Sequence, residues 1–495
     1  MNDSDSSRLA EFKSFLKSNR VLVFILIAAA VVWGLIFAQA TYDYIMLQTW
    51  NGWGQFNIFG FTIHFQFEGW SDYSYYYQTW GDRFLSGFTP YSSAFDYVTV
   101  DHYVPYFFPP LYLYLCVLGN SLPIDPFGTA VLLCVFGFAT AFPIYGIATF
   151  ISDSKRIGEI AAATYLFNPL ILFHTTYAWL NPAPFVFFII LSFYLLMKQH
   201  RLTGTLAMVT AALFKQTAFF LALPLIAYLI KTPPSNDLDV VQEADESRVL
   251  GDQTEVRGFL KMTVIVLVYF LIISFPYIID FRNYFYYIFQ RPGMSLFDDY
   301  TSLPAGNAPI SFAVLFIYFG APEALTRIIN IATAYSLFIV IGVLITFVPM
   351  LLEVKDDRNL PLYWRRMLYF TLLMLLIVHI FSPRGIYKYY LVALIPFFSI
   401  LSSERVITKH SEKIKTSLPM IINPFLLTIA ILMPNRIIYL AVLILLLATY
   451  IFYKEFGLVY TLISEPLSPV RARIVRIFLS ESMTTNTSRS LRNGR

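Results

Sequence analysis

The amino-acid sequence predicts an all-α fold, a polytopic bundle of transmembrane helices. Of its 495 residues, 57% are apolar and only 13% are charged, about half the charged fraction of a soluble domain. The apolar residues also occur in blocks of about 20, the length that crosses a bilayer as a helix. This composition excludes a soluble enzyme, a coiled coil and a disordered chain. The net charge of +4 is too small to indicate a nucleic-acid partner.

Basic clusters orient the predicted helices, because cytoplasmic loops retain Lys and Arg. Placing these clusters inside gives about 12 crossings, with both termini in the cytoplasm. The stretch 203–230 is too long for one crossing and basic on both flanks, so we expect two short helices that meet outside near Lys215 and Gln216. The predicted spans cover residues 21–42, 127–151, 159–178, 183–198, 203–230, 259–279, 328–352, 367–381, 387–401, 418–433 and 436–453.

These spans divide the chain into an N-terminal and a C-terminal transmembrane module. The expected segments are a cytoplasmic N-terminus (1–20), the first module (21–230) with an outer loop (43–125), a cytoplasmic acidic loop (231–258), the second module (259–453) and a cytoplasmic basic tail (454–495). We expect a multi-pass protein of the cell membrane, or of the endoplasmic reticulum membrane in a eukaryote. Both cysteines lie in apolar stretches, so the sequence indicates neither a disulfide framework nor a metal cluster.

The outer segment from Asp43 to Pro110 has an unusual composition. It contains one basic residue, Arg83, against six acidic ones: Asp43, Glu68, Asp72, Asp82, Asp96 and Asp101. It is also rich in Tyr and Trp, which favour the level of the lipid headgroups. We therefore predict short helices that lie on the outer leaflet and hold carboxylates just above the lipid. The alternative is an aromatic anchor whose acidic residues are only solvated.

Basic and polar residues gather at the predicted outer ends of later helices. They are Lys215, Gln216, Arg291, His379, Arg384 and Lys388. A lysine within an apolar run is costly unless it is paired or lies at a water-filled end. Each of these residues alone is typical of a snorkelling or structural charge. Together, carboxylates opposite several cations at the bilayer boundary favour chemistry on an anionic lipid headgroup.

Four motifs along the chain resemble those of the GT-C glycosyltransferases. The sequence Gly-Trp-Ser-Asp-Tyr at 69–73, followed by Phe-Phe-Pro-Pro-Leu-Tyr at 107–112, is similar to their first outer loop. Phe-Lys-Gln at 214–216 resembles a stretch of the dolichyl-phosphate-glucose glucosyltransferases. Residues 177–182 stand in the place of their motif ending in Gln-Tyr-Asn, although that Gln and Tyr are missing, and 381–390 stand in the place of a late His/basic motif. The missing pair leaves the sugar and the acceptor open.

The resemblance implies an integral-membrane, inverting hexosyltransferase with a catalytic outer loop. Mannose or glucose would pass from a polyprenyl- or dolichyl-phosphate-linked donor to a lipid-linked glycan or another acceptor on the outer face. Asp72, or second Asp101, would be the general base. Four cations would stabilise the departing phosphate: Lys215, Arg384, Lys388 and Arg291. Three further residues would bind the substrate: Gln216, Tyr73 and His379. The scheme needs no cofactor and no metal, because the donor carries a single phosphate.

Other classes of membrane protein remain alternatives. A secondary transporter or lipid flippase would place ionisable groups near the midplane and often show inverted repeats, whereas here the charges collect at helix ends and no repeat is visible. A polysaccharide polymerase or ligase would have its large outer loop late in the chain, while this one is early. A non-enzymatic membrane scaffold is the last alternative.

Overall fold

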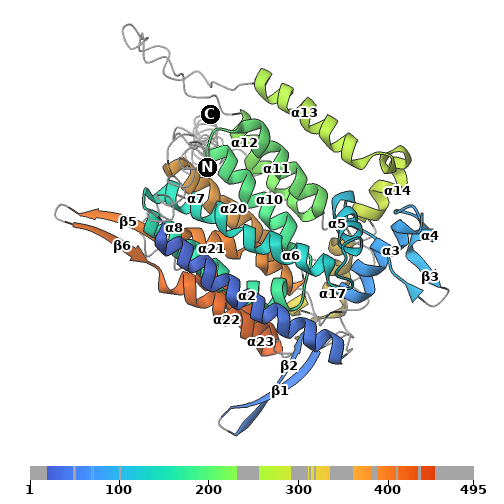
Figure 1. The fold of residues 1–495 in the computed structure, drawn as a ribbon, viewed down its shortest axis with the longest axis horizontal. Helices are drawn as coiled ribbons and strands as arrows, with labels where there is room; N and C mark the ends of the chain where they lie inside the picture. The colour runs from blue at the N-terminus through green and yellow to red at the C-terminus, as the bar shows by residue number, and fades with distance from the viewer. Residues whose placement is uncertain are drawn as a thin grey trace, which may run out of the picture.

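The fold is described from a computed structural model of the chain (Figure 1). The structure describes residues 19–47, 52–58, 60–67, 70, 72–99, 102–230, 256–290, 310–311, 314–316, 319–334, 361–381, 387–408, 411–432 and 436–451. Most of the predicted loop 231–258 and the predicted tail 454–495 lie outside these residues, as do most of the predicted N-terminus 1–20 and of the span 328–352. The predicted domain boundaries therefore stay a prediction.

The described chain is mostly helical. The first part contains α2 (Arg20–Leu47), α3 (Thr79–Leu85), α4 (Ser93–Asp96), α5 (Pro110–Asn120), α6 (Gly128–Ala139), α7 (Ala141–Ser152), α8 (Lys155–Leu166), α9 (Pro169–Ile171), α10 (Pro182–Met197), α11 (Arg201–Phe214) and α12 (Ala222–Ile230). The second part contains α13 (Val256–Ser274), α14 (Phe281–Phe285), α17 (Glu323–Ala334), α20 (Pro361–Phe381), α21 (Ile395–Leu401), α22 (Leu418–Leu432) and α23 (Arg436–Ile451). Short 3-10 or π-helical turns join them: η1 (Asp72–Gln78), η2 (Leu172–Tyr177), η3 (Gln216–Leu221), η5 (Tyr277–Asp280), η6 (Tyr286–Gln290) and η7 (Lys388–Ala393).

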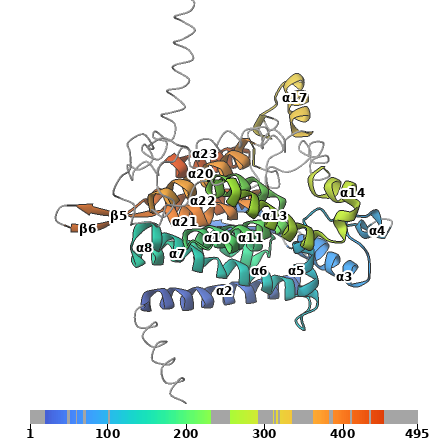
Figure 2. The ribbon, with the colours of Figure 1, turned by 90° about the horizontal axis from the view of Figure 1, so that it is seen from above.

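The helices form layers (Figure 2). Helix α2 is the outermost layer and packs on α8 and η2. Its side chains Phe24 and Leu35 are 72% and 67% exposed, which suits a surface that faces lipid. Helix α10 lies inside the bundle against α6, α7 and α11, and its buried side chains run from Pro182 to Met197.

Among the described residues, three helices are long and apolar enough to cross a membrane. They are Arg20–Met46, Gly128–Ser152 and Pro361–Ile380, and the number rises to five if each of two bent helix pairs is one span. The protein is therefore a membrane protein by its helices, but the predicted 12 crossings are not confirmed. The physical reason is that many apolar blocks break into pieces. Helix α11 has 14 residues, which is about 21 Å and shorter than the roughly 30 Å hydrocarbon core.

In the described part of the chain, three antiparallel hairpins interrupt the helices, and the all-α prediction did not include them. They pair β1 (Gly52–Ile58) with β2 (Phe61–Phe67), β3 (Tyr97–Thr99) with β4 (His102–Tyr103), and β5 (Ser403–Thr408) with β6 (Ser411–Thr416). The segment 61–67 alternates apolar and polar residues, the period of a strand, and the helical prediction for the outer loop overlooked this pattern. The predicted short helices of that loop are present as α3 and α4; their position on a leaflet stays a prediction.

Candidate functional site

The helix break at Lys215 positions the central cation of the candidate site. Helix α11 ends at Phe214, Lys215 adopts an extended backbone with φ −150° and ψ 125°, and η3 begins at Gln216. The predicted interruption near Lys215 is thus present, while a crossing by each half stays a prediction. Lys215 is only 6% exposed, because the break lies between the outer loop and η7.

The ammonium group of Lys215 is surrounded by aromatic side chains. Its Nζ lies 3.6 Å from the ring centroid of Phe108 and 4.5 Å from that of Tyr390, and it donates a hydrogen bond to the Tyr390 hydroxyl. Both rings offer their negative faces to the cation, an attraction that grows when water is excluded. The site therefore holds a lysine with little water around it.

Asp72, the first residue of η1, faces this cation. Burial raises the pKa of Asp72 to about 6, and the positive charge of Lys215 and a hydrogen bond with Tyr389 lower it in part. The hydroxyls of Tyr389 and Tyr390 lie 3.2 Å apart. Asp72, Tyr389, Tyr390 and Lys215 therefore form one connected polar cluster, which we call the Asp72–Lys215 cluster.

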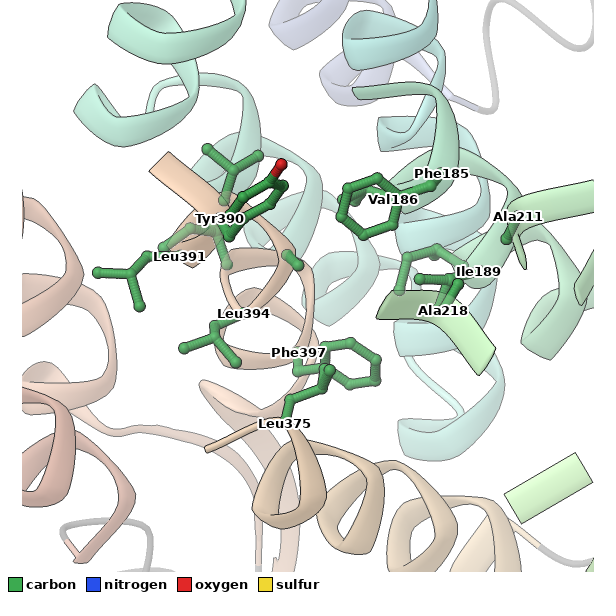
Figure 3. Packing of buried hydrophobic residues seen from close by; sticks show 14 of the residues in the cluster. Phe185, Val186, Ile189, Ala211, Ala218, Leu375, Tyr390, Leu391, Leu394 and Phe397 are labelled. Atoms are coloured by element: carbon green, nitrogen blue, oxygen red, sulfur yellow. The ribbon is translucent and has the colours of Figure 1, made fainter. Parts of the chain in front are cut away.

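Below Tyr390 the surroundings become apolar (Figure 3). Figure 3 shows Phe185 and Ile189 of α10 across from Tyr390, with Leu375 and Phe397 further below. These side chains belong to the buried core. The Asp72–Lys215 cluster therefore lies at the border between the apolar interior of the bundle and the polar outer loop.

The remaining predicted site residues divide into four groups. Gln216 donates to the carbonyls of Phe107 at 3.2 Å and Ile288 at 3.4 Å, so it ties two segments together at the cluster. Tyr73 forms a hydrogen bond with the Pro126 carbonyl, and His379 forms one with the Leu375 carbonyl; their substrate-binding roles stay a prediction.

Lys388 is 4% exposed at the start of η7 and interacts electrostatically with His174. Both ring nitrogens of His174 are buried without a hydrogen-bond partner. Lys388 thus lies in the segment that carries Tyr389 and Tyr390. Three further predicted residues lie outside the described part of the chain: Asp101, Arg291 and Arg384.

Three contributors to the site were missed at the level of sequence. Phe108, Tyr389 and Tyr390 supply the rings and hydroxyls around Lys215. All three lie inside the motifs at 107–112 and 381–390, but the sequence indicated roles only for other residues of the outer loop and of these motifs. The usable signal is that a lysine in an apolar segment needs aromatic or hydroxyl partners, since its charge is otherwise costly to bury.

Chemically, the cluster is suited to holding an anion. Asp72 interacts electrostatically with Lys215 and forms a hydrogen bond with Tyr389, so it balances part of the charge of the lysine; its role as a general base stays a prediction. An anionic group that enters can replace Asp72 as the counterion of Lys215, and Asp72 can then take up a proton. Lysine is a common ligand of phosphate as a point charge.

Comparison with known proteins finds one family model, the GPI transamidase subunit PIG-U, which matches residues 99–291, less than half of the chain. No curated protein matches the chain. The matched segment includes Phe108, Lys215 and Gln216, and it ends one residue after η6.

This match corrects the predicted function. The expected hexosyltransferase is wrong, because the matched family is named as a subunit of a transamidase, and the transporter alternative receives no support. The resemblance to GT-C proteins holds only at the level of related membrane proteins, and no finding supports a dolichyl-phosphate-sugar donor. The physical reason for the error is that carboxylates opposite cations look alike in a site that transfers a sugar and in one that only holds an anionic lipid. Over residues 99–291, then, the chain is similar to the GPI transamidase subunit PIG-U.

Proposed function

We propose that this protein is a non-catalytic membrane subunit of a transamidase complex, and that its Asp72–Lys215 cluster holds the anionic headgroup of a lipid. GPI denotes glycosylphosphatidylinositol, a lipid whose headgroup carries phosphate. The observation that carries the proposal is the match to PIG-U over 99–291, which covers both Phe108 and Lys215 of the cluster. The partners are then the other subunits of the complex and a phosphate-bearing membrane lipid.

The charge arrangement supports a holding role. Lys215 is a buried cation that lies against two rings, donates to a neutral hydroxyl and interacts electrostatically with one carboxyl group, that of Asp72. Because the pKa of Asp72 is about 6, little free energy is needed to protonate this carboxyl near neutral pH. A phosphate therefore displaces Asp72 from Lys215 more readily than it would displace an ordinary carboxylate.

The cysteines support a non-catalytic role. Transamidation needs a nucleophile to carry the acyl group, and activated thiols commonly serve. The chain has two cysteines. Cys116 is buried in α5, and the Sγ of Cys134, within α6, contacts the Thr175 carbonyl at 3.6 Å. We therefore assign the acyl-transfer step to another subunit.

The proposed location is the endoplasmic reticulum membrane, one of the two membranes expected from the sequence, with both termini in the cytoplasm. The match to a transamidase subunit supports this membrane, and the candidate spans support integration into a bilayer. The basic clusters support the orientation.

The experiment is depletion of the protein in its native host, followed by parallel analysis of anchored proteins and of the lipid-linked precursor. We expect attachment of lipid to protein to be lost while the complete precursor accumulates. Re-expression of the wild type should restore attachment, and Lys215→Met should not. Accumulation of a precursor that lacks one sugar would instead contradict a subunit role and indicate a defect in glycan synthesis.

A further inference from the structure

Asp96 is a buried acidic residue that lies outside the Asp72–Lys215 cluster. It ends α4 and is only 1% exposed. Acidic residues are rarely buried so completely unless they accept hydrogen bonds. The partners of Asp96 therefore indicate what it does.

Asp96 joins two segments that are far apart in the sequence. Its Oδ1 accepts a hydrogen bond from the Tyr106 backbone N–H at 3.0 Å, and its carbonyl accepts one from Val104 at 2.7 Å. Its side chain also forms a hydrogen bond with Tyr287 of η6. One carboxylate thus fastens both the outer loop and η6.

From Tyr106 the connection continues to the ring that covers Lys215. The Tyr106 hydroxyl donates to the Pro109 carbonyl at 2.7 Å and accepts from the Leu113 N–H at 3.0 Å, which fixes the start of α5. The intervening Phe108 is held through its carbonyl by the Tyr91 hydroxyl at 2.9 Å, and its ring faces Lys215.

The connection through η6 reaches the same place. Tyr287 precedes Ile288, whose carbonyl accepts from the side chain of Gln216, and Gln216 also donates to Phe107. The outer loop, which precedes Lys215 in the sequence, and η6, which follows it, are therefore both bonded to Asp96 and both contact the Lys215–Gln216 segment.

We propose that Asp96 is a positioning residue, which connects the outer loop to η6 and so holds the Phe108 ring over Lys215. It touches no ligand itself. The inference rests on the proposed function only for what Lys215 binds; the covering of Lys215 is a property of the chain alone.

The experiment measures how fast Lys215 is acylated by a small amine-reactive ester in the full-length protein in a non-ionic detergent without lipid, with peptide mass spectrometry as the readout. Asp96→Ala should raise the rate at Lys215 by roughly tenfold or more, because losing buried hydrogen bonds favours local opening. The rate at Lys155, which is exposed in the wild type, should not change. Asp96→Asn should restore protection, since its amide can accept from Tyr106 and donate to Tyr287.

Two further variants keep the test decisive. Asp82→Ala removes an exposed acid of the same loop, whose carboxylate accepts a hydrogen bond from the Asn120 side chain at 2.9 Å, and should leave Lys215 protected. Tyr287→Phe removes only the hydrogen bond between Tyr287 and Asp96, so it should raise the rate of Lys215 acylation by a smaller factor. This variant provides the test if Asp96→Ala fails to fold. Wild-type protection of Lys215 in folded Asp96→Ala, or in Tyr287→Phe, would overturn the inference. Because the assay contains no lipid ligand and no partner subunit, its outcome is independent of whether the proposed function holds.

Discussion

Replacing Asp72 with Asn should make the protein more stable at neutral pH. Burial raises the pKa of Asp72 from its ordinary 3.8 to about 6, a difference of about 2, which corresponds to about 3 kcal/mol. The folded state prefers the protonated carboxyl, so its stabilising contribution is complete below pH 3.8 and is lost as the pH rises through 6. Asn resembles the protonated carboxyl in shape and charge, and it avoids this loss.

The assay is thermal unfolding in detergent, followed by the intrinsic fluorescence of buried tryptophans such as Trp70 and Trp179, a readout that works at both acidic and neutral pH. At pH 4 the variant and the wild type should have similar midpoints. At pH 7.5 the variant should unfold several degrees higher, because up to about 3 kcal/mol separates the two proteins. All midpoints should be taken at one scan rate, since unfolding of such proteins is commonly irreversible.

The result that would refute this reasoning is a lower midpoint for Asp72→Asn at pH 7.5, with a pH dependence equal to that of the wild type. It would mean that the attraction between Asp72 and Lys215 exceeds the cost of burying the carboxylate. Lys215→Met is the matched control. It removes the cation that lowers the pKa of Asp72, so the pH dependence of its stability should be steeper than that of the wild type.

Two further predictions concern the fold. Gly128→Ala should destabilise the protein by about 1–3 kcal/mol, although alanine favours a helix. The added Cβ would lie 2.0 Å from the Gly119 carbonyl oxygen, where α5 and α6 are in contact. An unchanged unfolding midpoint would contradict this close contact between the two helices. Glu404→Gln should lower the free energy of unfolding by about 3–5 kcal/mol, because Glu404 forms a buried ion pair with Arg365 at 3.2 Å. Arg405→Ala should lower it by only about 0–1 kcal/mol, because its partner Asp153 is 91% exposed. Equal losses in these two variants would argue against burial as the deciding factor.

The sequence by itself determined that this is a helical membrane protein, because hydropathy is a sum over neighbouring residues and needs no knowledge of tertiary contacts. It also indicated the break at Lys215, since a charge within an apolar run forces the helix to end or to find partners. The number of crossings was not predictable in this way. Helix ends depend on packing as well as on composition, and α11 ends after 14 residues within a longer apolar stretch.

Only the tertiary structure decided what surrounds the charged residues. The sequence assigned Asp72 and Lys215 to one outer-face site, but it did not indicate that Tyr389 and Tyr390 connect them or that the Phe108 ring covers the lysine. Such contacts join residues that are distant in the chain. The pKa of Asp72 follows from the water that these contacts exclude, so no local pattern of residues could predict it. The expected sugar transfer came from the resemblance of short motifs, and such motifs do not determine these contacts.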